Sequence, residues 1–274
     1  MIAAIAEKCK KIAVQMRQDI VGLADITGGN MHWGGTLSCT DILAVLYGAI
    51  LNGTEKDLPY LQKDKLILSK GHSSAALYTA LATVGVIDRD ELKTFQKNGS
   101  RLSEHSVLNE KLGIECSTGS LGTGFSFGVG LAIAAKKKNY PYHTYVIVGD
   151  GECDEGIIWE AILSAKQFEL DNLTLVIDNN GYQADGANDD IIRLNDLQKK
   201  LEAFGWRTMV VDGHDYHQLL EVFQLPPSAG VPTAVVAKTI KGKGISFMEN
   251  ENSWHHRVLN KELLEQAKKE VGII

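Results

Sequence analysis

Cysteine and proline are scarce in this chain of 274 residues, which contains four cysteines and five prolines. The cysteines form no CxxC pair and no zinc-like cluster; they are Cys9, Cys39, Cys116 and Cys153. This pattern argues against a disulfide framework and against a zinc finger. We therefore expect free thiols in a reducing compartment.

Long apolar runs and long basic runs are also missing. No stretch reaches the roughly 18 apolar residues of a membrane span. The beginning of the chain is interrupted by charged side chains such as Glu7, Lys8 and Arg17. We therefore expect an amphipathic helix there instead of a signal peptide, and a cytoplasmic protein. The formal net charge of −6 argues against nucleic acid and against an anionic membrane as partners.

The remaining composition is that of a soluble globular protein, with 44% hydrophobic and 23% charged residues. Short apolar runs rich in β-branched residues alternate with helical patterns, as they do around buried parallel strands. We predict one doubly wound α/β domain over residues 1–274, with a mainly parallel sheet and helices on both faces. The predicted strands are 66–68, 144–148, 173–177, 207–211 and 233–237. The predicted helices lie near 3–24, 40–51, 73–84, 89–97, 125–138, 156–168, 194–204, 215–224 and 260–270.

Polar and glycine residues follow the predicted strands. They are Ser69-Lys70-Gly71-His72, Gly149-Asp150-Gly151, Asp178-Asn179-Asn180-Gly181, Asp212-Gly213-His214 and Lys238-Thr239. Open parallel sheets bind ligands outside the carboxyl ends of their strands. The sequence therefore predicts a ligand site at this edge of the sheet.

The sharpest signal is the tripeptide Gly149-Asp150-Gly151, paired with Asn179-Asn180 at the next strand end. One helix separates the two strands, so the side chains of Asp150 and Asn180 should emerge side by side. Mg²⁺ prefers about six oxygen ligands, often shared with the phosphates of a bound molecule. The glycines let the backbone approach a diphosphate, and the following helix N-terminus adds amide donors. Gly-Asp-Gly alone could be an ordinary turn, but the pairing with Asn-Asn favours a metal site.

The pairing resembles the signature of thiamine diphosphate enzymes, in which GDG and NN are separated by a similar spacer. Residues 152–178 form the spacer here. Other segments resemble those of the transketolase family, in the family's order and over nearly the whole chain. The segments similar to GHPG, GHG/S, PGHP, GPLG, KTxxGxG and WHG are 30–34, 70–73, 103–105, 119–122, 238–244 and 253–255.

This resemblance implies a thiamine diphosphate and Mg²⁺ site and a role for each matching residue. The implied metal ligands are Asp150, Asn180 and the carbonyl oxygen of Tyr182. The implied cofactor contacts are His72, Gly119, Leu121, Gly149, Asp150, Gly151, Asn180 and His255. The implied catalytic residues are His32, His72, His105, His255 and Glu155. The histidines suit hydroxyl binding and proton transfer near neutral pH, and Glu155 matches an acid at the subunit interface.

Four positions depart from the family pattern. Trp33 and Ser120 replace prolines, Glu104 replaces a glycine, and His256 follows the last histidine, where the pattern has glycine. We expect Trp33 to narrow or reshape the entrance of the pocket, which leaves the exact sugar open. The metal and diphosphate assignment does not depend on these positions.

Structural alternatives stand beside these roles. Each pocket histidine could be a structural side chain, and adjacent residues such as His255 and His256 rarely chelate one ion together. We expect His214 to have a structural role at a strand end. Lys238 and Lys241 could steer phosphate or could lie in a solvated loop.

The resemblance also implies what is absent. In this superfamily, the glutamate that activates the aminopyrimidine lies on a second α/β domain, and full transketolases carry that domain and a C-terminal one after the region seen here. We expect both on a partner chain, with sugar phosphates as substrates and a heterotetramer of two chains of each kind. The implied reaction is transfer of a two-carbon ketol unit from a ketose phosphate to an aldose phosphate. The alternatives are a split thiamine diphosphate enzyme acting on a modified sugar or acyloin substrate, and a non-catalytic cofactor-binding paralogue.

Overall fold

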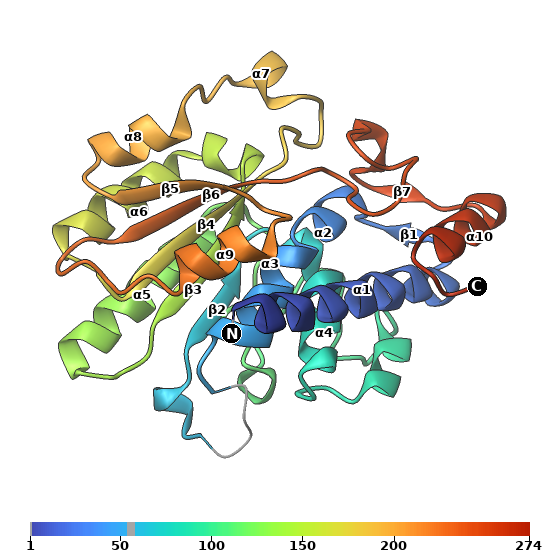
Figure 1. Cartoon of the computed structure of the whole chain (residues 1–274), viewed down its shortest axis with the longest axis horizontal. Helices are drawn as coiled ribbons and strands as arrows, with labels where there is room; N and C mark the ends of the chain where they lie inside the picture. Colours follow the sequence, from blue (N-terminus) through green and yellow to red (C-terminus); the bar gives the residue numbers. More distant parts are fainter. Residues whose placement is uncertain (1, 54–57) are drawn as a thin grey trace.

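The computed structural model describes residues 2–53 and 58–274. The main sheet contains five parallel strands in the order β2-β3-β4-β6-β5 (Figure 1). The strands are β2 (Lys65–Leu68), β3 (Thr144–Gly149), β4 (Leu173–Asn179), β5 (Arg207–Asp212) and β6 (Thr233–Lys238). All five lie where the apolar runs predicted them, and the parallel sheet is confirmed.

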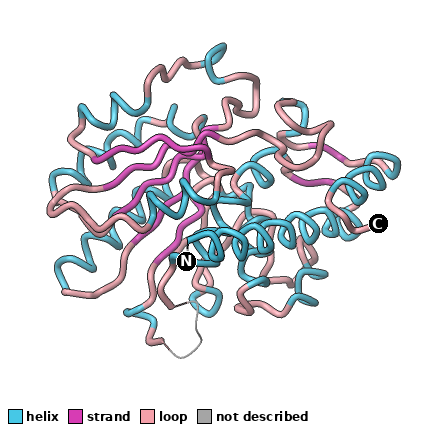
Figure 2. Tube along the Cα trace, viewed as in Figure 1, coloured by secondary structure: helices cyan, strands magenta, loops and turns pink. Residues whose placement is uncertain are grey.

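Helices cover both faces of this sheet (Figure 2). They are α1 (Ile2–Thr27), α2 (Gly34–Ser38), α3 (Thr40–Val45), α4 (Ser74–Thr83), α5 (Thr123–Lys138), α6 (Gly156–Gln167), α7 (Asn188–Ile191), α8 (Leu197–Ala203), α9 (Tyr216–Phe223) and α10 (Lys261–Glu270). The doubly wound fold is therefore confirmed. No helix among the described residues is long and apolar enough to cross a membrane.

Two hydrophobic clusters fill the space between the sheet and the helices. Helices α1, α3, α4 and α9 pack over side chains such as Leu66, Ile147 and Val235 on one face. Helices α5, α6 and α8 pack over Ile67 and Val146, which point to the other face, because successive strand residues alternate. The face on which each helix lies follows from the direction in which the chain crosses the sheet. Helices α6 and α8 belong to connections that run from β3 towards β5, whereas α9 belongs to the connection that runs back from β5 to β6. Because crossover connections between parallel strands are right-handed, connections that run in opposite directions place their helices on opposite faces of the sheet.

Local structure departs from the sequence prediction in five places. The helix expected near 89–97 is a 3₁₀ segment, Arg89–Thr94. The helix expected near 40–51 is α3 followed by a π-helical turn, Leu46–Ile50. Helix α8 starts three residues later than expected because the Asp196 side chain caps it, accepting a hydrogen bond from the Lys199 amide. Helices α2 and α7 were not predicted, since five and four residues carry too little periodicity.

A short antiparallel ribbon lies beside the main sheet (Figure 1). Strand β1 (Asn30–Met31) pairs with β7 (Arg257–Val258), and Met31 lies opposite Arg257. The ribbon joins the beginning and the end of the chain. It thereby brings His32, His255 and His256 close together.

Candidate functional site

A cavity of about 360 Å³ lies at the carboxyl ends of β3 and β4. Eleven of the twelve predicted site residues line it: His32, His72, His105, Gly119, Leu121, Gly149, Asp150, Gly151, Asn180, Tyr182 and His255. The twelfth, Glu155, is not among the lining residues; it is exposed at the start of α6. The structure therefore brings together the cluster that the sequence pattern predicted.

Strand register explains why Asp150 and Asn180 meet at this cavity. Gly149 lies opposite Asp178 in the sheet, so both chains leave the sheet at the same level. Asp150 is 2% exposed and Asn180 is 8% exposed. The Asp150 carboxylate accepts hydrogen bonds from the amides of Gly151 at 2.9 Å and Gly181 at 2.5 Å. These contacts orient its oxygens at the cavity wall.

The donor set at this wall fits a hard cation. A carboxylate and an amide side chain supply oxygen, which Mg²⁺ prefers. No lysine, arginine or histidine forms an ion pair with Asp150 in the described part of the chain. Burial, followed by the charge of Asp178, raises the pKa of Asp150 to about 6. A divalent cation would supply the positive charge that this buried carboxylate lacks.

A buried ion pair supports the floor of the site. Lys70, which follows β2, pairs with Asp178 of β4, and the two residues are 1% and 0% exposed. The Lys70 ammonium also donates to the carbonyl of Gly35 at 2.9 Å. Asp178 accepts a further hydrogen bond from the Ser38 hydroxyl at 2.6 Å. The pair thus ties β2, β4 and α2 together beneath the cavity.

Glu152 holds three segments of the cavity wall in place. Its carboxylate accepts from the Gly122 amide at 2.7 Å, from the Gly149 amide at 3.1 Å and from the Ser69 hydroxyl at 2.5 Å. Gly122 has φ +81°, and a Cβ there would lie 2.3 Å from Cγ2 of Ile157. The turn before α5 therefore requires glycine at position 122, and the carboxylate of Glu152 holds this turn through the Gly122 amide.

Lys241 lines the cavity and supplies a buried positive charge. It is 1% exposed, so the alternative of a solvated loop is wrong for this residue. Its ammonium donates to the Gln183 carbonyl at 3.0 Å and to the Asn252 side-chain oxygen at 2.7 Å. Burial, followed by the charge of Lys70, lowers the pKa of Lys241 to about 8. No carboxylate pairs with it in the described residues, and an anionic group would complement it.

Small residues shape the space for such an anion. A Cβ at Gly151 would lie 2.6 Å from Cβ of Gln183, and one at Gly35 would lie 3.0 Å from Nε2 of His72. Protein atoms therefore fill the space beside these two glycines, whereas a Cβ at Gly149 would have no neighbour closer than 4.0 Å, so the backbone is open at Gly149. Together with Lys241 and the oxygen ligands, the residues present fit a diphosphate accompanied by a metal ion.

Four histidines form the outer wall of the cavity. The ring centroid of His32 lies 5.3 Å from that of His72, 5.7 Å from that of His105 and 5.6 Å from that of His255. Burial is the main cause of a lowered pKa in three of them. It acts with Lys241 to bring His255 to about 3, with His256 to bring His32 to about 4, and with Lys70 to hold His72 well below its usual value. These shifts favour the neutral form of all three rings, so proton uptake near neutral pH would need a nearby anion.

The departures from the family pattern lie in different places. Trp33 is fully buried and does not line the cavity, so the expectation that it reshapes the entrance is wrong. Its indole nitrogen donates to the carbonyls of Gly29 and Arg257, both at 3.1 Å. Ser120 is exposed. Glu104 and His256, in contrast, both lie against His32.

His214 has the structural role that we expected for it. One ring nitrogen lies 2.7 Å from a carboxylate oxygen of Asp41, and the other accepts from the Ile240 amide at 2.9 Å. Asp41 also binds Arg17 through two hydrogen bonds of 2.9 and 2.6 Å and accepts from Tyr216 at 2.5 Å. Burial alone would raise the pKa of Asp41, but these partners outweigh it and lower the pKa far below its usual value.

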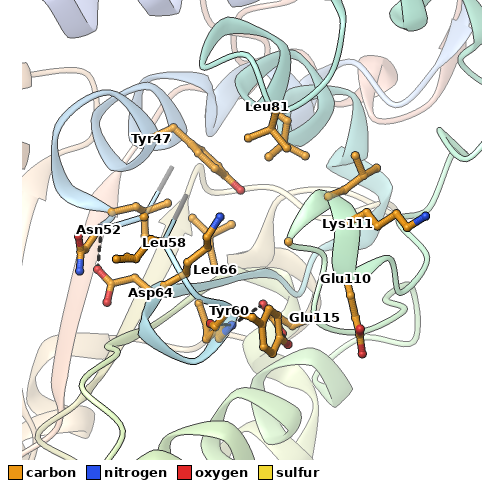
Figure 3. A pocket seen from close by; sticks show the side chains of 17 residues that line it. Tyr47, Asn52, Leu58, Tyr60, Asp64, Leu66, Leu81, Glu110, Lys111 and Glu115 are labelled. Atoms are coloured by element: carbon orange, nitrogen blue, oxygen red, sulfur yellow. Dashed lines mark hydrogen bonds and ion pairs between the residues drawn. The ribbon is translucent and has the colours of Figure 1, made fainter. Parts of the chain in front are cut away.

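Another cavity, of about 490 Å³, lies beside the start of β2. Figure 3 shows Tyr60 and Glu115 facing each other there, with Tyr47 and Leu81 on the opposite wall. Glu115 pairs with the ammonium of Lys65 at 3.2 Å, so the charges of these two residues neutralise each other. None of the predicted site residues lines it, and it lies at the amino end of the strand. We do not assign the ligand site to it.

The sequence prediction did not include Glu152 or Asp178 among the site residues, and it left Lys241 open between phosphate binding and a solvated loop. Glu152 lies in the short 3₁₀ segment Gly151–Asp154 after β3, whereas Asp178 directly follows an apolar run and lies within β4, where a charged residue is buried if the strand is buried. For Asp178, that position was the available signal. The burial of Lys241 could not be predicted from neighbouring residues, because it depends on contacts with the distant residues Gln183 and Asn252.

Known proteins resemble the chain over nearly its full length. Residues 11–274 match the family described as "Transketolase, thiamine diphosphate binding domain". The chain belongs to the transketolase family. Its relatives are transferases, and one of the subunits of the apulose-4-phosphate transketolase of Actinobacillus succinogenes is 40% identical over 97% of this chain and 96% of that protein. A 6-deoxy-6-sulfo-D-fructose transketolase subunit from a Clostridium species is 39% identical over 86% of each chain.

Solved transketolase structures share the fold. The transketolase of Campylobacter jejuni superimposes with a TM-score of 0.85 and 29% identity. The match covers 98% of this chain and 43% of the Campylobacter chain, so this chain spans less than half of that longer protein. The family resemblance and the α/β fold predicted from the sequence are both confirmed.

Proposed function

We propose that this chain binds the diphosphate end of thiamine diphosphate together with Mg²⁺. Asp150, Asn180 and the carbonyl oxygen of Tyr182 would be the metal ligands contributed by the protein. Diphosphate oxygens and water would complete the six oxygens that Mg²⁺ prefers. The proposal is supported by the position of Asp150 and Asn180 at adjacent strand ends and by the oxygen donors that they supply.

The remaining cavity residues would hold the rest of the cofactor and the sugar. Gly149 and Gly151 would allow close approach of the diphosphate, with Lys241 adding a positive charge. Gly119 and Leu121 would flank the rings of the cofactor. The four wall histidines, His32, His72, His105 and His255, would form hydrogen bonds with sugar hydroxyls and with the diphosphate.

We further propose that the chain is one half of a ketol transferase. When bound, thiamine diphosphate supplies the electron sink for breaking the carbon–carbon bond beside a ketone. This chain would orient the cofactor and the sugar and would exclude water from them. A partner chain would contribute the glutamate that activates the aminopyrimidine, and Glu155, exposed at the start of α6, would face that partner. Two chains of each kind would form the assembly, in the cytoplasm.

The observation that carries this proposal is the convergence of eleven predicted residues on one cavity. The test is ketol transfer by the native complex. The tagged chain is recovered from its own cells with bound partners, and thiamine diphosphate and Mg²⁺ are added. Transfer from xylulose 5-phosphate to ribose 5-phosphate by the complex, but not by the isolated chain, is the expected result. Transfer by the isolated chain would refute the need for a partner.

A modified sugar is the second candidate substrate. It is favoured by the names of two relatives that match most of this chain and most of their own length, since these two are named for unusual sugars. The same complex can be offered a branched or sulfonated ketose phosphate beside xylulose 5-phosphate. A higher kcat/KM for the modified sugar would select this candidate.

A variant of Asp150 tests the metal assignment. Asp150→Asn should keep much of the local hydrogen bonding but should weaken Mg²⁺-dependent retention of thiamine diphosphate at least tenfold, because a charged ligand is lost. Asp154→Asn is the matched control, because Asp154 does not line the cavity. Retention of the cofactor by Asp150→Asn with unchanged affinity would contradict the assignment. Equilibrium dialysis with and without Mg²⁺ measures the affinity for thiamine diphosphate.

A further inference from the structure

Two of the departures from the transketolase pattern meet at one histidine. Oε1 of Glu104 lies 3.0 Å from Nδ1 of His32 and 3.4 Å from Nε2 of His256. The rings of His32 and His256 have their centroids 4.4 Å apart. The pattern has glycine at positions 104 and 256, so neither of the two added ligand groups would exist in a chain that followed it.

The backbone presents these three side chains from fixed positions. Met31 and Arg257, the neighbours of His32 and His256, lie opposite each other in the β1–β7 ribbon. The indole of Trp33 fastens the same two segments through its hydrogen bond to the Arg257 carbonyl. The carbonyl of Glu104 accepts a hydrogen bond from Ser74 of α4. The ribbon therefore positions His32 and His256, and the hydrogen bond from α4 positions Glu104.

The geometry of the three ligand atoms suits a tetrahedral ion. Zinc binds imidazole nitrogen and carboxylate oxygen at about 2.0–2.2 Å, which places neighbouring ligand atoms of a tetrahedron about 3.3–3.6 Å apart. The two separations of 3.0 and 3.4 Å are close to that edge, and all three atoms lie within 4.8 Å of one another. Nδ1 of His32 is buried and has no hydrogen bond of acceptable geometry, despite its short distance to Glu104.

The chemistry of this set differs from that of the Asp150 site. Two imidazoles and one carboxylate favour zinc or a similar borderline transition metal, whereas all-oxygen sets favour Mg²⁺. Three protein ligands leave a fourth position open to water or to a substrate oxygen. His32 also lines the cavity, so an ion bound here would lie at its wall.

We propose that His32, Glu104 and His256 bind one Zn²⁺ ion at the edge of the cavity, and that the bound ion inhibits the enzyme by withdrawing His32 from the substrate. The binding part stands on this geometry alone, whereas the inhibitory part rests on the proposed function. Zinc would then act as a regulator of this site and not as its resident cofactor.

The experiment uses the native complex, loaded first with thiamine diphosphate and excess Mg²⁺ so that the oxygen site is filled. Zinc affinity is measured by competition with a chromophoric chelator. One Zn²⁺ per chain is expected in the wild type. Glu104→Gln and the double variant Glu104→Gly/His256→Gly should each lose more than the roughly 10–100-fold that loss of an outer-shell partner costs. His217→Ala, which removes an exposed histidine on α9, is the control and should bind zinc as the wild type does.

Two readouts separate this inference from the proposed function. Far-ultraviolet circular dichroism and retention of thiamine diphosphate report whether each variant is folded. Zinc-sensitive transfer in the wild type and zinc-resistant transfer in the double variant would support the whole proposal. Equal zinc affinity in wild type and folded double variant would overturn it, even if ketol transfer occurs. Glu104-dependent zinc binding by a complex without transfer would support the metal site and refute the proposed function instead.

Discussion

The buried ion pair between Lys70 and Asp178 offers the sharpest test of how the fold supports the site. The change is Lys70→Met, which removes the charge and keeps a similar chain length. Asp178 would then remain fully buried, with hydroxyl donors such as Ser38 as its partners. A buried carboxylate without a cation carries a large desolvation penalty that hydroxyl groups offset only in part.

The expected magnitude follows from this environment. Removing one partner of a buried ion pair typically costs about 3–5 kcal/mol, whereas replacing both partners by apolar groups is often neutral or stabilising. Lys70→Met should therefore lower the free energy of unfolding by about 3–5 kcal/mol. The double variant Lys70→Met/Asp178→Leu should recover most of that loss. The single variant should still fold, because domains are typically stable by about 5–15 kcal/mol.

Urea unfolding of the purified chain, followed by circular dichroism, measures these differences. Lys93→Met is the matched control, because Lys93 pairs with Asp90 on the surface; its unfolding midpoint should not move. A loss below about 1 kcal/mol for Lys70→Met would refute the reasoning, since such values are typical of exposed ion pairs. So would a double variant whose loss equals the sum of the two single losses, because the partners would then be energetically independent.

Three further changes test other parts of the structure by the same unfolding assay. Gly122→Ala should cost about 1–3 kcal/mol through overpacking at positive φ, whereas Gly156→Ala, with open space around it, should not destabilise; equal effects would contradict this. Because the pKa of Lys241 falls from 10.5 to about 8 on folding, the unfolded chain binds more protons between these values. Wild type should therefore gain stability over Lys241→Met as pH rises through that window, and a constant difference would disprove the shift. Asp41→Asn should cost about 3–5 kcal/mol by leaving its buried arginine partner unpaired. Because the pKa of Asp41 is lowered from 3.8 on folding, the unfolded chain binds more protons below that value. The difference from wild type should therefore be constant above about pH 5 and should shrink as the pH falls from about 4 to about 2; a difference that stays unchanged over that range would refute the ion pair.

Much of the fold could be predicted from the sequence because its strands carry their own signal. Four of the five runs of the main sheet are buried on both faces, and all five are followed by turn residues, so length and composition suffice. The β1–β7 ribbon could not be predicted in this way. Each of its strands has two residues, and the pairing is set by the packing of segments more than 220 residues apart.

The candidate site likewise contains residues whose placement could be predicted from the sequence and residues whose placement could not. Asp150 and Asn180 were predictable because the strand ends that carry them are adjacent in both sequence and sheet. The placement of Trp33 was predicted wrongly, because its burial depends on the pairing of β1 with β7, which the sequence did not reveal. The ribbon turns Trp33 into the core instead, where its nitrogen finds two carbonyl partners. Glu155 remains a prediction, since its assigned role depends on a partner chain.

The charges around the cavity explain why one ligand of mixed charge suits it. Asp150 is a buried carboxylate and Lys241 a buried ammonium, and each lacks an ion-pair partner in the described residues. Burial shifts both groups toward their neutral forms. A free anion would attract the ammonium of Lys241 but would repel the carboxylate of Asp150. A free cation would attract Asp150 but would repel Lys241. A diphosphate that carries its own divalent cation supplies both charges together, so metal and diphosphate should each strengthen the binding of the other.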